Sequence, residues 1–176
     1  YSGSFAYQSS HQVGDARVDN VAMRIETVAA GGGSICRVVD GLLKVGPESA
    51  GAYPGPACYG FGGPLCLTDV NLLLGRLDPS QFSTPVFESA SKQRLNQWVE
   101  QSDRSAQDLL HGFLSLADDA MANAIRKVSV AEGYDPSDHA LVSFGGAGGQ
   151  HACGVAERLG MDQILSPGDS GLLSAY

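Results

Sequence analysis

Residues 139–166 have the sequence HALVSFGGAGGQHACGVAERLGMDQILS, and this stretch decides the class of fold. Its apolar beginning, 139–144, predicts a strand, and the glycine-rich run 145–150 predicts a turn. The run 151–160 predicts a helix, and 162–166 predicts a second strand. A strand, a glycine turn and a helix in this order present backbone N–H groups and a positive helix end to a ligand. The stretch therefore predicts an α/β fold.

The glycines of this turn are compatible with more than one role. The dinucleotide fingerprint G-x-G-x-x-G would begin at Gly146, but its third glycine falls on His151. The P-loop pattern is excluded, because no Gly-Lys-Ser/Thr follows the glycines. Two interpretations stay open: the bare backbone admits a flat ring or a ribose, or the glycines only let the strand and the helix pack closely.

The first part of the chain predicts β-structure. Residues 2–8 and 23–30 alternate between apolar and polar or small side chains, as strands do. Residues 34–46 predict a hairpin whose turn is Asp40-Gly41, a pair that accepts positive φ.

A glycine- and proline-rich run, 46–66, follows the hairpin. Its prolines exclude a helix or a central strand. A disordered segment lacks apolar anchors, whereas this one carries Tyr53, Cys58, Tyr59 and Phe61. We therefore expect an ordered loop that lies against a site or an interface.

The middle of the chain predicts three helices. A short one within 67–79 is expected to be capped by Thr68 or Asp69, and a second covers 88–101. The longest begins at Ser105, where the sequence SAQD is a capping box followed by a helical apolar stripe. We expect one fragment with three parts: a β-rich part over 1–66, a helical part over 67–133 and the strand–turn–helix unit over 134–176.

The composition argues against several classes of function. The formal net charge is −8, with 19 acidic and 11 basic residues, so we expect no nucleic-acid partner. No run approaches the ~20 apolar residues that cross a bilayer, so we expect no membrane segment. The four cysteines form no C-x-x-C pair, which fits a reducing cytoplasm better than a disulfide framework. Because the chain does not begin with Met, we expect a piece of a longer protein.

Three stretches stand in order along the chain: ETVAAGGGSICRV (26–38), GLLKVGPESAGAYPGPACYGFGGPLCLTDVNLLLGRLDP (41–79) and LVSFGGAGGQHACGVAERLGMDQIL (141–165). Together they resemble the hydantoinase A / 5-oxoprolinase family, and the glycine turn is most similar to that of the ATP-dependent 5-oxoprolinases. The resemblance implies a partial actin/sugar-kinase/Hsp70-like (ribonuclease H-like) α/β fold. It also implies a cytoplasmic enzyme of glutathione metabolism that uses ATP and Mg²⁺ to open 5-oxo-L-proline to L-glutamate.

The resemblance also assigns candidate site residues. The turn for the nucleotide would consist of Gly145, Gly146, Ala147, Gly148, Gly149, Gln150 and His151. A second turn, for an anion or the reacting lactam, would consist of Thr27, Gly31, Gly32, Gly33 and Ser34. Glu48 and Asp69 are candidate catalytic or Mg²⁺-binding carboxylates, with hydrogen bonding to the loop backbone and helix capping as their alternative roles. For His151, the alternative to contact with the ligand is a cap on the helix.

Some features depart from the family pattern. Tyr53 and Arg24 stand where many members have Asp, so no acidic role passes to either position. The D-x-G-G-T-type phosphate turns of the family do not occur in these 176 residues, so we expect this chain alone to be inactive. We expect the intact protein to form a homo-oligomer or to work with a hydantoinase B-type subunit or domain. An N-methylhydantoinase, an acetone-carboxylase-type subunit and a non-catalytic assembly domain are the alternatives.

Overall fold

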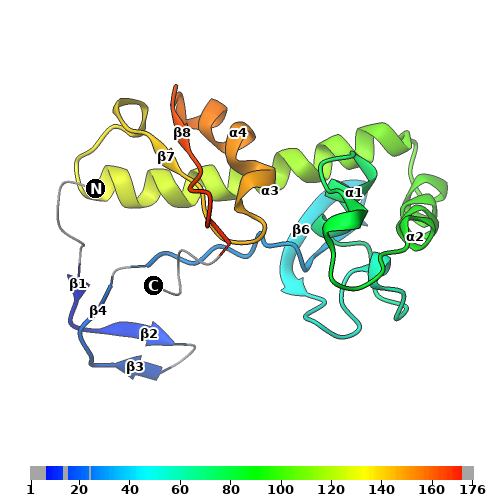
Figure 1. The fold of residues 1–176 in the computed structure, drawn as a ribbon, viewed down its shortest axis with the longest axis horizontal. Coiled ribbons are helices and arrows are strands. Elements are labelled where there is room, and N and C mark those ends of the chain that lie inside the picture. The colour runs from blue at the N-terminus through cyan, green and yellow to red at the C-terminus, as the bar shows by residue number, and fades with distance from the viewer. Residues whose placement is uncertain (1–6, 14–15, 24, 172–176) are drawn as a thin grey trace.

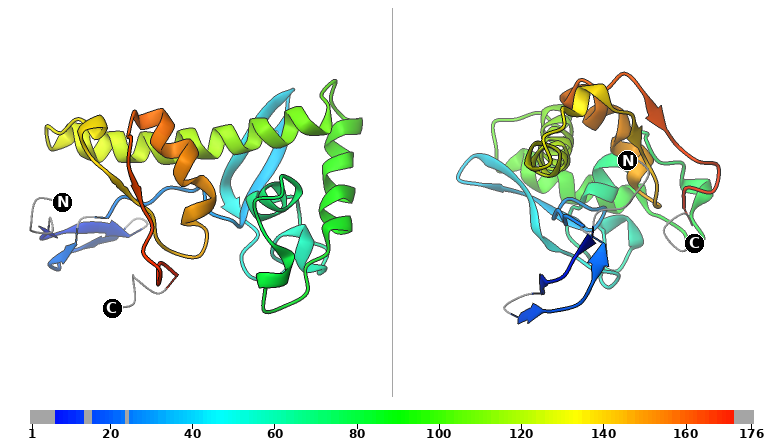
Figure 2. Two further views of the ribbon diagram at one scale, coloured as in Figure 1. Left: turned by 45° about the horizontal axis from the view of Figure 1, so that its top comes forward. Right: turned by 90° about the vertical axis from the view of Figure 1, so that its left-hand side faces the viewer.

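The computed structural model describes residues 7–13, 16–23 and 25–171. It is a mixed α/β arrangement built along one long helix, α3 (Ala106–Ala131), which runs the length of the main body (Figure 1). A β-hairpin and two helices pack at one end of α3, and a further helix with a strand pair packs nearer its other end. Figure 2 shows α2 crossing α3 near the N-terminal end of α3, with α1 in the corner between the two helices.

The other elements follow in chain order. They are β1 (Tyr7–Gln8), β2 (His11–Val13), β3 (Ala16–Val18), β4 (Ala22–Met23), β5 (Ser34–Val39), β6 (Leu42–Ser49), η1 (Ala57–Tyr59), α1 (Leu67–Leu73), η2 (Pro79–Gln81), α2 (Glu88–Glu100), then after α3 η3 (Pro136–Asp138), β7 (Leu141–Val142), α4 (Gly148–Leu159) and β8 (Ile164–Leu165).

The predicted hairpin is confirmed. Strands β5 and β6 pair antiparallel, and their turn residues have positive φ, 52° at Asp40 and 74° at Gly41. Strand β6 continues to Ser49, beyond the predicted end of the hairpin. It can pass through Pro47 because the register shifts between the pairs Cys36–Val45 and Ser34–Ser49, so Pro47 has no ladder partner to lose.

The loop predicted over 46–66 is ordered, as expected, but it begins at residue 50, because residues 46–49 belong to β6. Its residues Ala57, Cys58, Leu65 and Cys66 are almost completely buried, and Cys36 of β5 donates its backbone N–H to the Leu65 carbonyl at 2.8 Å. The loop therefore packs into the core beside the hairpin, α1 and α2.

Local signals placed the three middle helices well, with one correction. Helix α3 is capped by Ser105, whose hydroxyl accepts the Asp108 N–H at 3.1 Å, and α2 covers almost the whole predicted range. Helix α1 ends before Gly75, which has a φ of 70°. Its N-cap is Cys66, whereas Thr68 or Asp69 was predicted, because Asp69 sits at the third helical position and accepts the Cys66 N–H.

The strand–turn–helix unit is confirmed, with shifted bounds. Strands β7 and β8 are short and parallel, pairing Leu141 with Ile164 and Val142 with Leu165. Helix α4 begins at Gly148, three residues earlier than predicted, so two of the turn glycines form its first turn. Glycine is unfavourable in a helix interior, but Gly148 and Gly149 occupy only the first turn of α4, where the N–H groups have no intrahelical partner.

Two hydrophobic clusters hold the body together. The larger one joins the hairpin, α1, α2 and α3 around Phe113, Leu109, Leu67 and Val70, each fully buried. Truncating a fully buried Phe to Ala costs ~3–5 kcal/mol, so Phe113 alone contributes a large part of the stability of this cluster. The smaller one joins α3 to α4 through Ala122, Val155 and Leu159.

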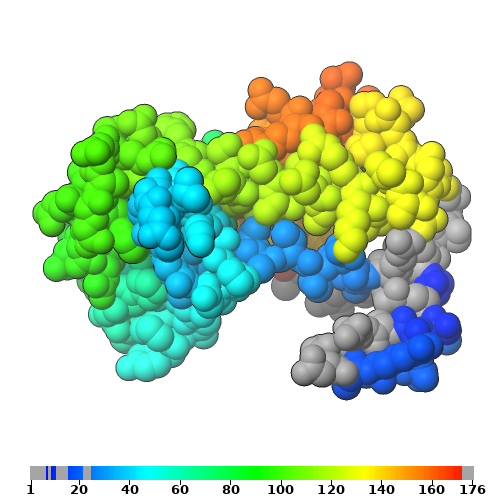
Figure 3. Space-filling view, turned by 180° about the vertical axis from the view of Figure 1, so that it is seen from behind, coloured from blue at the N-terminus to red at the C-terminus, as the bar shows by residue number. Residues whose placement is uncertain are grey.

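Two small antiparallel pairs, β1 with β4 and β2 with β3, stand apart from the helical body (Figure 3). The strand prediction for 23–30 is wrong beyond Met23: residues 25–30 form no strand and run along α3 instead. There Glu26 forms an ion pair with Lys127. Most of the predicted strand 2–8, and Arg24, lie outside the described residues. Within the described part of the chain, no helix combines the length and apolarity that crossing a membrane requires.

Candidate functional site

The two glycine turns singled out in the sequence meet in one pocket. Gly32 and Gly33 of the first turn and Gly146, Ala147 and Gln150 of the second line a cavity of about 620 Å³. We call this cavity the glycine pocket. Its other lining residues are Gly51, Pro56, Tyr59, Thr68, Arg76, Leu77, Asp78, Gln81 and Phe82.

The second turn is held in place from both sides. Ser143 at the end of β7 donates its N–H to the Leu165 carbonyl at 2.8 Å. Gly145 donates its N–H to the Ser170 carbonyl at 2.7 Å and has a φ of 85°, a conformation that favours glycine. The chain then enters α4 within three residues, so the N-terminus of α4 adjoins the pocket.

The glycines of the two turns differ in why they lack a side chain. A Cβ at Gly32 would lie 2.7 Å from the Thr68 hydroxyl oxygen, and one at Gly33 equally close to that of Ser49, so close packing accounts for both. A Cβ at Gly146 would meet no atom within 4 Å, and Gly146 has no positive φ. Packing therefore does not explain Gly146, which leaves open space in the glycine pocket.

The first turn is fixed by backbone hydrogen bonds. The Gly31 carbonyl accepts the Ser34 N–H at 2.9 Å, and the Gly33 carbonyl accepts the Ala50 N–H at 2.9 Å. The Gly32 carbonyl accepts both the N–H of Thr68, at 2.9 Å, and its hydroxyl, at 3.0 Å. Of the five predicted residues, only Gly32 and Gly33 line the pocket; Thr27 is exposed elsewhere and Ser34 is buried.

Sequence reasoning missed most of the side chains of this pocket. Arg76, the single Lys or Arg among the lining residues, donates from Nη1 to the Gln150 carbonyl at 2.8 Å and so joins the end of α1 to the second turn. Asp78 accepts the hydroxyl and the N–H of Ser80, and these hydrogen bonds lower the pKa of its carboxyl. The signal that could have found Arg76 is its place in the GRLDP motif directly after α1.

Asp69 organises the loop that forms one wall of the pocket. Its side chain is fully buried and accepts the N–H groups of Ala57 at 3.0 Å, Cys58 at 2.7 Å and Cys66 at 2.8 Å. It also accepts the Ser91 hydroxyl at 2.6 Å. Each carboxylate oxygen thus has two donors, which accounts for this buried charge without a ligand or a metal ion.

Glu48 lies away from the pocket. It is exposed near the end of β6 and pairs with Arg37 on β5, across the hairpin. Neither residue lines the glycine pocket. The structure therefore keeps the two candidate carboxylates, Glu48 and Asp69, in separate surroundings.

His151 is buried, with 3% of its surface exposed, and both ring nitrogens have partners. Its Nδ1 lies 2.7 Å from Asp118 Oδ1 on α3, and its Nε2 lies 3.3 Å from Asn71 Nδ2 on α1. The helix cap, one of the two alternative roles considered for His151, is not formed, because no side chain caps α4. His151 presents no free nitrogen to the glycine pocket.

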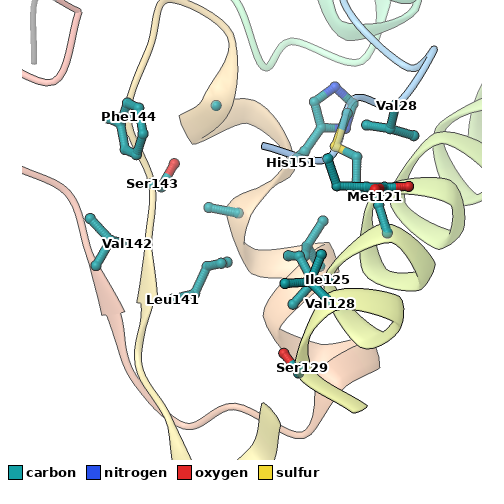
Figure 4. Close-up of a pocket in the computed structure, with 15 residues that line it drawn as sticks. Val28, Met121, Ile125, Val128, Ser129, Leu141, Val142, Ser143, Phe144 and His151 are labelled. Carbon is teal, nitrogen blue, oxygen red and sulfur yellow. The ribbon is translucent and has the colours of Figure 1, made fainter. Parts of the chain in front are cut away.

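A second hollow, of about 640 Å³, lies between α3 and the β7–α4 unit. Met121, Ile125 and Val128 of α3 face Leu141 of β7 across it, and His151 closes its upper end (Figure 4). Its lining is mainly apolar. It therefore suits an apolar partner surface or an apolar part of a ligand.

The cysteines test the packing of the loop that Asp69 holds. Burial, followed by the charge of Asp69, raises the pKa of both the Cys58 and the Cys66 thiol to about 12, and burial also raises the pKa of Cys36. Cys153 is exposed and free.

In the intact protein we expect N-ethylmaleimide to label Cys153 alone among these four, with no labelling of Cys58 or Cys66 between pH 7 and 9. Peptide mass spectrometry before and after urea measures this; native labelling of Cys58 as fast as in urea contradicts it.

No group of three or more His, Cys, Asp or Glu side chains in the described ranges is arranged to hold a metal ion. Among the residues that the structure describes, Asp78 is the one carboxylate that lines the glycine pocket. These residues do not fit a dedicated Mg²⁺ site, which uses carboxylates together with phosphate oxygens and water.

Comparison with known proteins identifies the family of this chain. The sequence pattern of the hydantoinase/oxoprolinase family matches residues 1–176. The chain is 44% identical to 5-oxoprolinase PfmaA of Pestalotiopsis fici over 191 aligned positions, covering 100% of this chain and 15% of that protein.

Two solved structures have the same fold over most of the chain. An ATP-dependent acetone carboxylase in its nucleotide-free form matches with a TM-score of 0.86 and 25% identity, over 98% of this chain and 25% of that one. The ATP-dependent caprolactamase from Pseudomonas jessenii matches with a TM-score of 0.82 and 39% identity, over 90% of this chain and 24% of that one. The chain belongs to the hydantoinase/oxoprolinase family.

Proposed function

We propose that this chain forms part of the active site of an ATP-dependent hydrolase of cyclic amides. The reaction we assign to the intact protein is that of a 5-oxoprolinase: 5-oxo-L-proline, ATP and water give L-glutamate, ADP and phosphate. The observation that carries the proposal is the glycine pocket, where two distant turns meet and Gly146 leaves open space that packing does not require. The 44% identity to a 5-oxoprolinase supports the choice of substrate class.

The chemistry explains why ATP is needed. A lactam is a resonance-stabilised amide and a poor electrophile. Attack of its carbonyl oxygen on the γ-phosphorus of ATP, with loss of ADP, turns that oxygen into a leaving group. Water then attacks the ring carbon and the ring C–N bond breaks, which leaves a free amine and an acyl phosphate. A second water hydrolyses the acyl phosphate to L-glutamate and phosphate, so two waters are consumed for each ATP. Such catalysis rests mainly on positioning and on stabilisation of the phosphoryl charge.

This chain would supply the nucleoside end of that site. The bare backbone at Gly146 and Ala147 leaves room for a purine or ribose, and the N-terminus of α4 adjoins it. Arg76 adds a positive charge to the same pocket, and the turn at Gly32 and Gly33 faces the remaining space, where the lactam or a phosphate would lie.

The rest of the site would come from other parts of the intact protein. We place there the phosphate-binding turns and the ligands of Mg²⁺, because the described residues offer no metal cage, and we derive no step through the ion. The parallel β7–turn–α4–β8 unit supports an actin-like, ribonuclease H-like fold for the intact protein. The name "Caprolactamase subunit alpha" of a 39% identical relative supports a multi-subunit assembly, for which we propose a hydantoinase B-type partner.

The test is ADP release by the intact protein with 5-oxo-L-proline, with caprolactam, with N-methylhydantoin, or with acetone and bicarbonate. We expect the greatest stimulation, with stoichiometric glutamate, from 5-oxoproline. Stimulation only by caprolactam, only by N-methylhydantoin or only by acetone with bicarbonate would reassign the substrate within the family. Nucleotide binding without stimulation by any of the four would contradict the proposal. The 176-residue chain alone is expected to show no ATPase activity.

A further inference from the structure

Helix α1 touches both turns of the glycine pocket. At its start, Thr68 donates two hydrogen bonds to the Gly32 carbonyl, at 2.9 and 3.0 Å. In its middle, Asn71 reaches His151 on α4, and just beyond its end Arg76 reaches the Gln150 carbonyl. A short helix therefore ties the first turn to the second, although the turns lie far apart in the sequence.

The contact at His151 is the buried one of these ties. Asn71 is fully buried and His151 almost so, whereas Arg76 is exposed to solvent. A carboxylate only accepts hydrogen bonds, so the Nδ1–H of His151 donates to Asp118, and Nε2 is left to accept the Asn71 amide N–H. Asp118 thus orients the ring and Asn71 binds it.

Asp118 is itself held tightly. A Cβ at Gly154 would lie 2.1 Å from Asp118 Oδ2, so glycine is needed there for α4 to come this close to α3. Arg158, one turn further along α4, lies 3.5 Å from the same oxygen. His151, Gly154 and Arg158 follow helical spacing, and all three meet Asp118 from one side of α4.

Stability alone does not explain this arrangement. Among the described residues, the Asn71 Oδ1 atom is a buried side-chain oxygen without a hydrogen-bond partner, which is a cost to folding. An apolar residue would pack at this position without that cost. The amide is better explained by the contact its other end makes with His151.

We propose that His151 is a positioning residue: bound by Asn71 and oriented by Asp118, it fixes the glycine turn of α4 at a set distance from the Gly32 turn. His151 does not contact the ligand; it affects ligand binding by setting the shape of the glycine pocket. This inference rests on the proposed function only for its affinity readout.

The variants distinguish the contact of His151 Nδ1 with Asp118 from the contact of its Nε2 with Asn71. His151→Asn keeps a donor near the position of Nδ1, toward Asp118, and loses the contact with Asn71. His151→Gln keeps a polar group near the position of Nε2. Asn71→Leu preserves volume, removes the unpaired oxygen and leaves Asp118 paired. Leu159→Ala, at the other end of α4 in the smaller cluster, is a destabilised control.

In the intact protein we expect His151→Asn and Asn71→Leu each to weaken binding of ADP about tenfold, the loss that one buried hydrogen bond supports. The double variant should be no weaker than either single one, because both remove the same contact. His151→Gln should lose less, and Leu159→Ala should lower the unfolding temperature while leaving the ADP affinity unchanged.

Hydrogen exchange gives a readout that needs no nucleotide. The amides of residues 148–152 should exchange faster in His151→Asn and Asn71→Leu than in the wild type and in Leu159→Ala. The wild-type protein could fail to bind ADP while the two variants still exchange faster than it does. That result would support the positioning role and overturn the proposed function. Unchanged exchange and unchanged ADP affinity in Asn71→Leu would overturn the positioning role.

Discussion

Replacing Asp69 with alanine is expected to cost at least about 4 kcal/mol of folding free energy, because it leaves four buried donors without an acceptor and each costs ~1–3 kcal/mol. The donors are the N–H groups of Ala57, Cys58 and Cys66 and the hydroxyl of Ser91. A whole domain is stable by only ~5–15 kcal/mol, so the loop over 50–66 should come free or the region should unfold. Thermal unfolding of the intact protein, with hydrogen exchange of residues 50–66, measures the effect.

Two further variants grade the same prediction. Ser91→Ala removes one of the four donors and should cost clearly less than Asp69→Ala, since the other three hydrogen bonds remain. Asp69→Asn replaces one acceptor oxygen with a donor that faces N–H groups, so it should lie between them. An unchanged unfolding temperature in Asp69→Ala would contradict the structural role. A folded Asp69→Asn enzyme with unchanged turnover of 5-oxoproline would remove Asp69 from the chemistry.

Replacing Gly146 with valine is expected to weaken nucleotide binding by the intact protein about tenfold to a hundredfold, because a branched side chain would fill space that the ligand needs. Folding should be unaffected, since a Cβ at this position meets no atom within 4 Å and the backbone has no positive φ. Gly146→Ala should show a smaller loss of the same kind. Isothermal titration with ADP, together with thermal unfolding, measures both quantities.

Gly168→Val is the matched control for this substitution. A Cβ at Gly168 also meets nothing within 4 Å, its φ is not positive, and it does not line the glycine pocket. It should bind ADP as the wild type does. Equal affinity in Gly146→Val and Gly168→Val would show that the open space at Gly146 is not used by the nucleotide.

The elements that could be predicted from the sequence are those with signals close together in the chain. The Asp40-Gly41 turn and the Ser105 cap of α3 each depend on a few adjacent residues, and the structure has both. The strand predicted over 23–30 is wrong beyond Met23. Alternating apolar and polar side chains indicate which residues would face solvent, but a strand also needs a neighbouring strand to pair with, and residues 25–30 have none among residues 7–13, 16–23 and 25–171. Residues 25–30 run along α3 with Ile25 68% exposed.

The site could be predicted only in part, because its residues take their roles from distant neighbours. The two glycine turns were found from their composition, but nothing local shows that Gly32 and Gly146 share a pocket. Asp69 looked like a helix cap or a catalytic acid until its donors on the loop and on α2 were known. For His151, ligand contact and a helix cap were the alternatives from the sequence. Its actual partners, Asn71 and Asp118, lie on two other helices and leave no local signal.

The most direct test of the whole account is a crystal structure of the intact protein with ADP bound. We expect the adenosine to lie against the main chain of Gly146 and Ala147, with its phosphates directed toward the Gly32 turn and His151 still bound to Asn71. Nucleotide bound at a different surface, with the glycine pocket filled by side chains from elsewhere in the protein, would contradict the account.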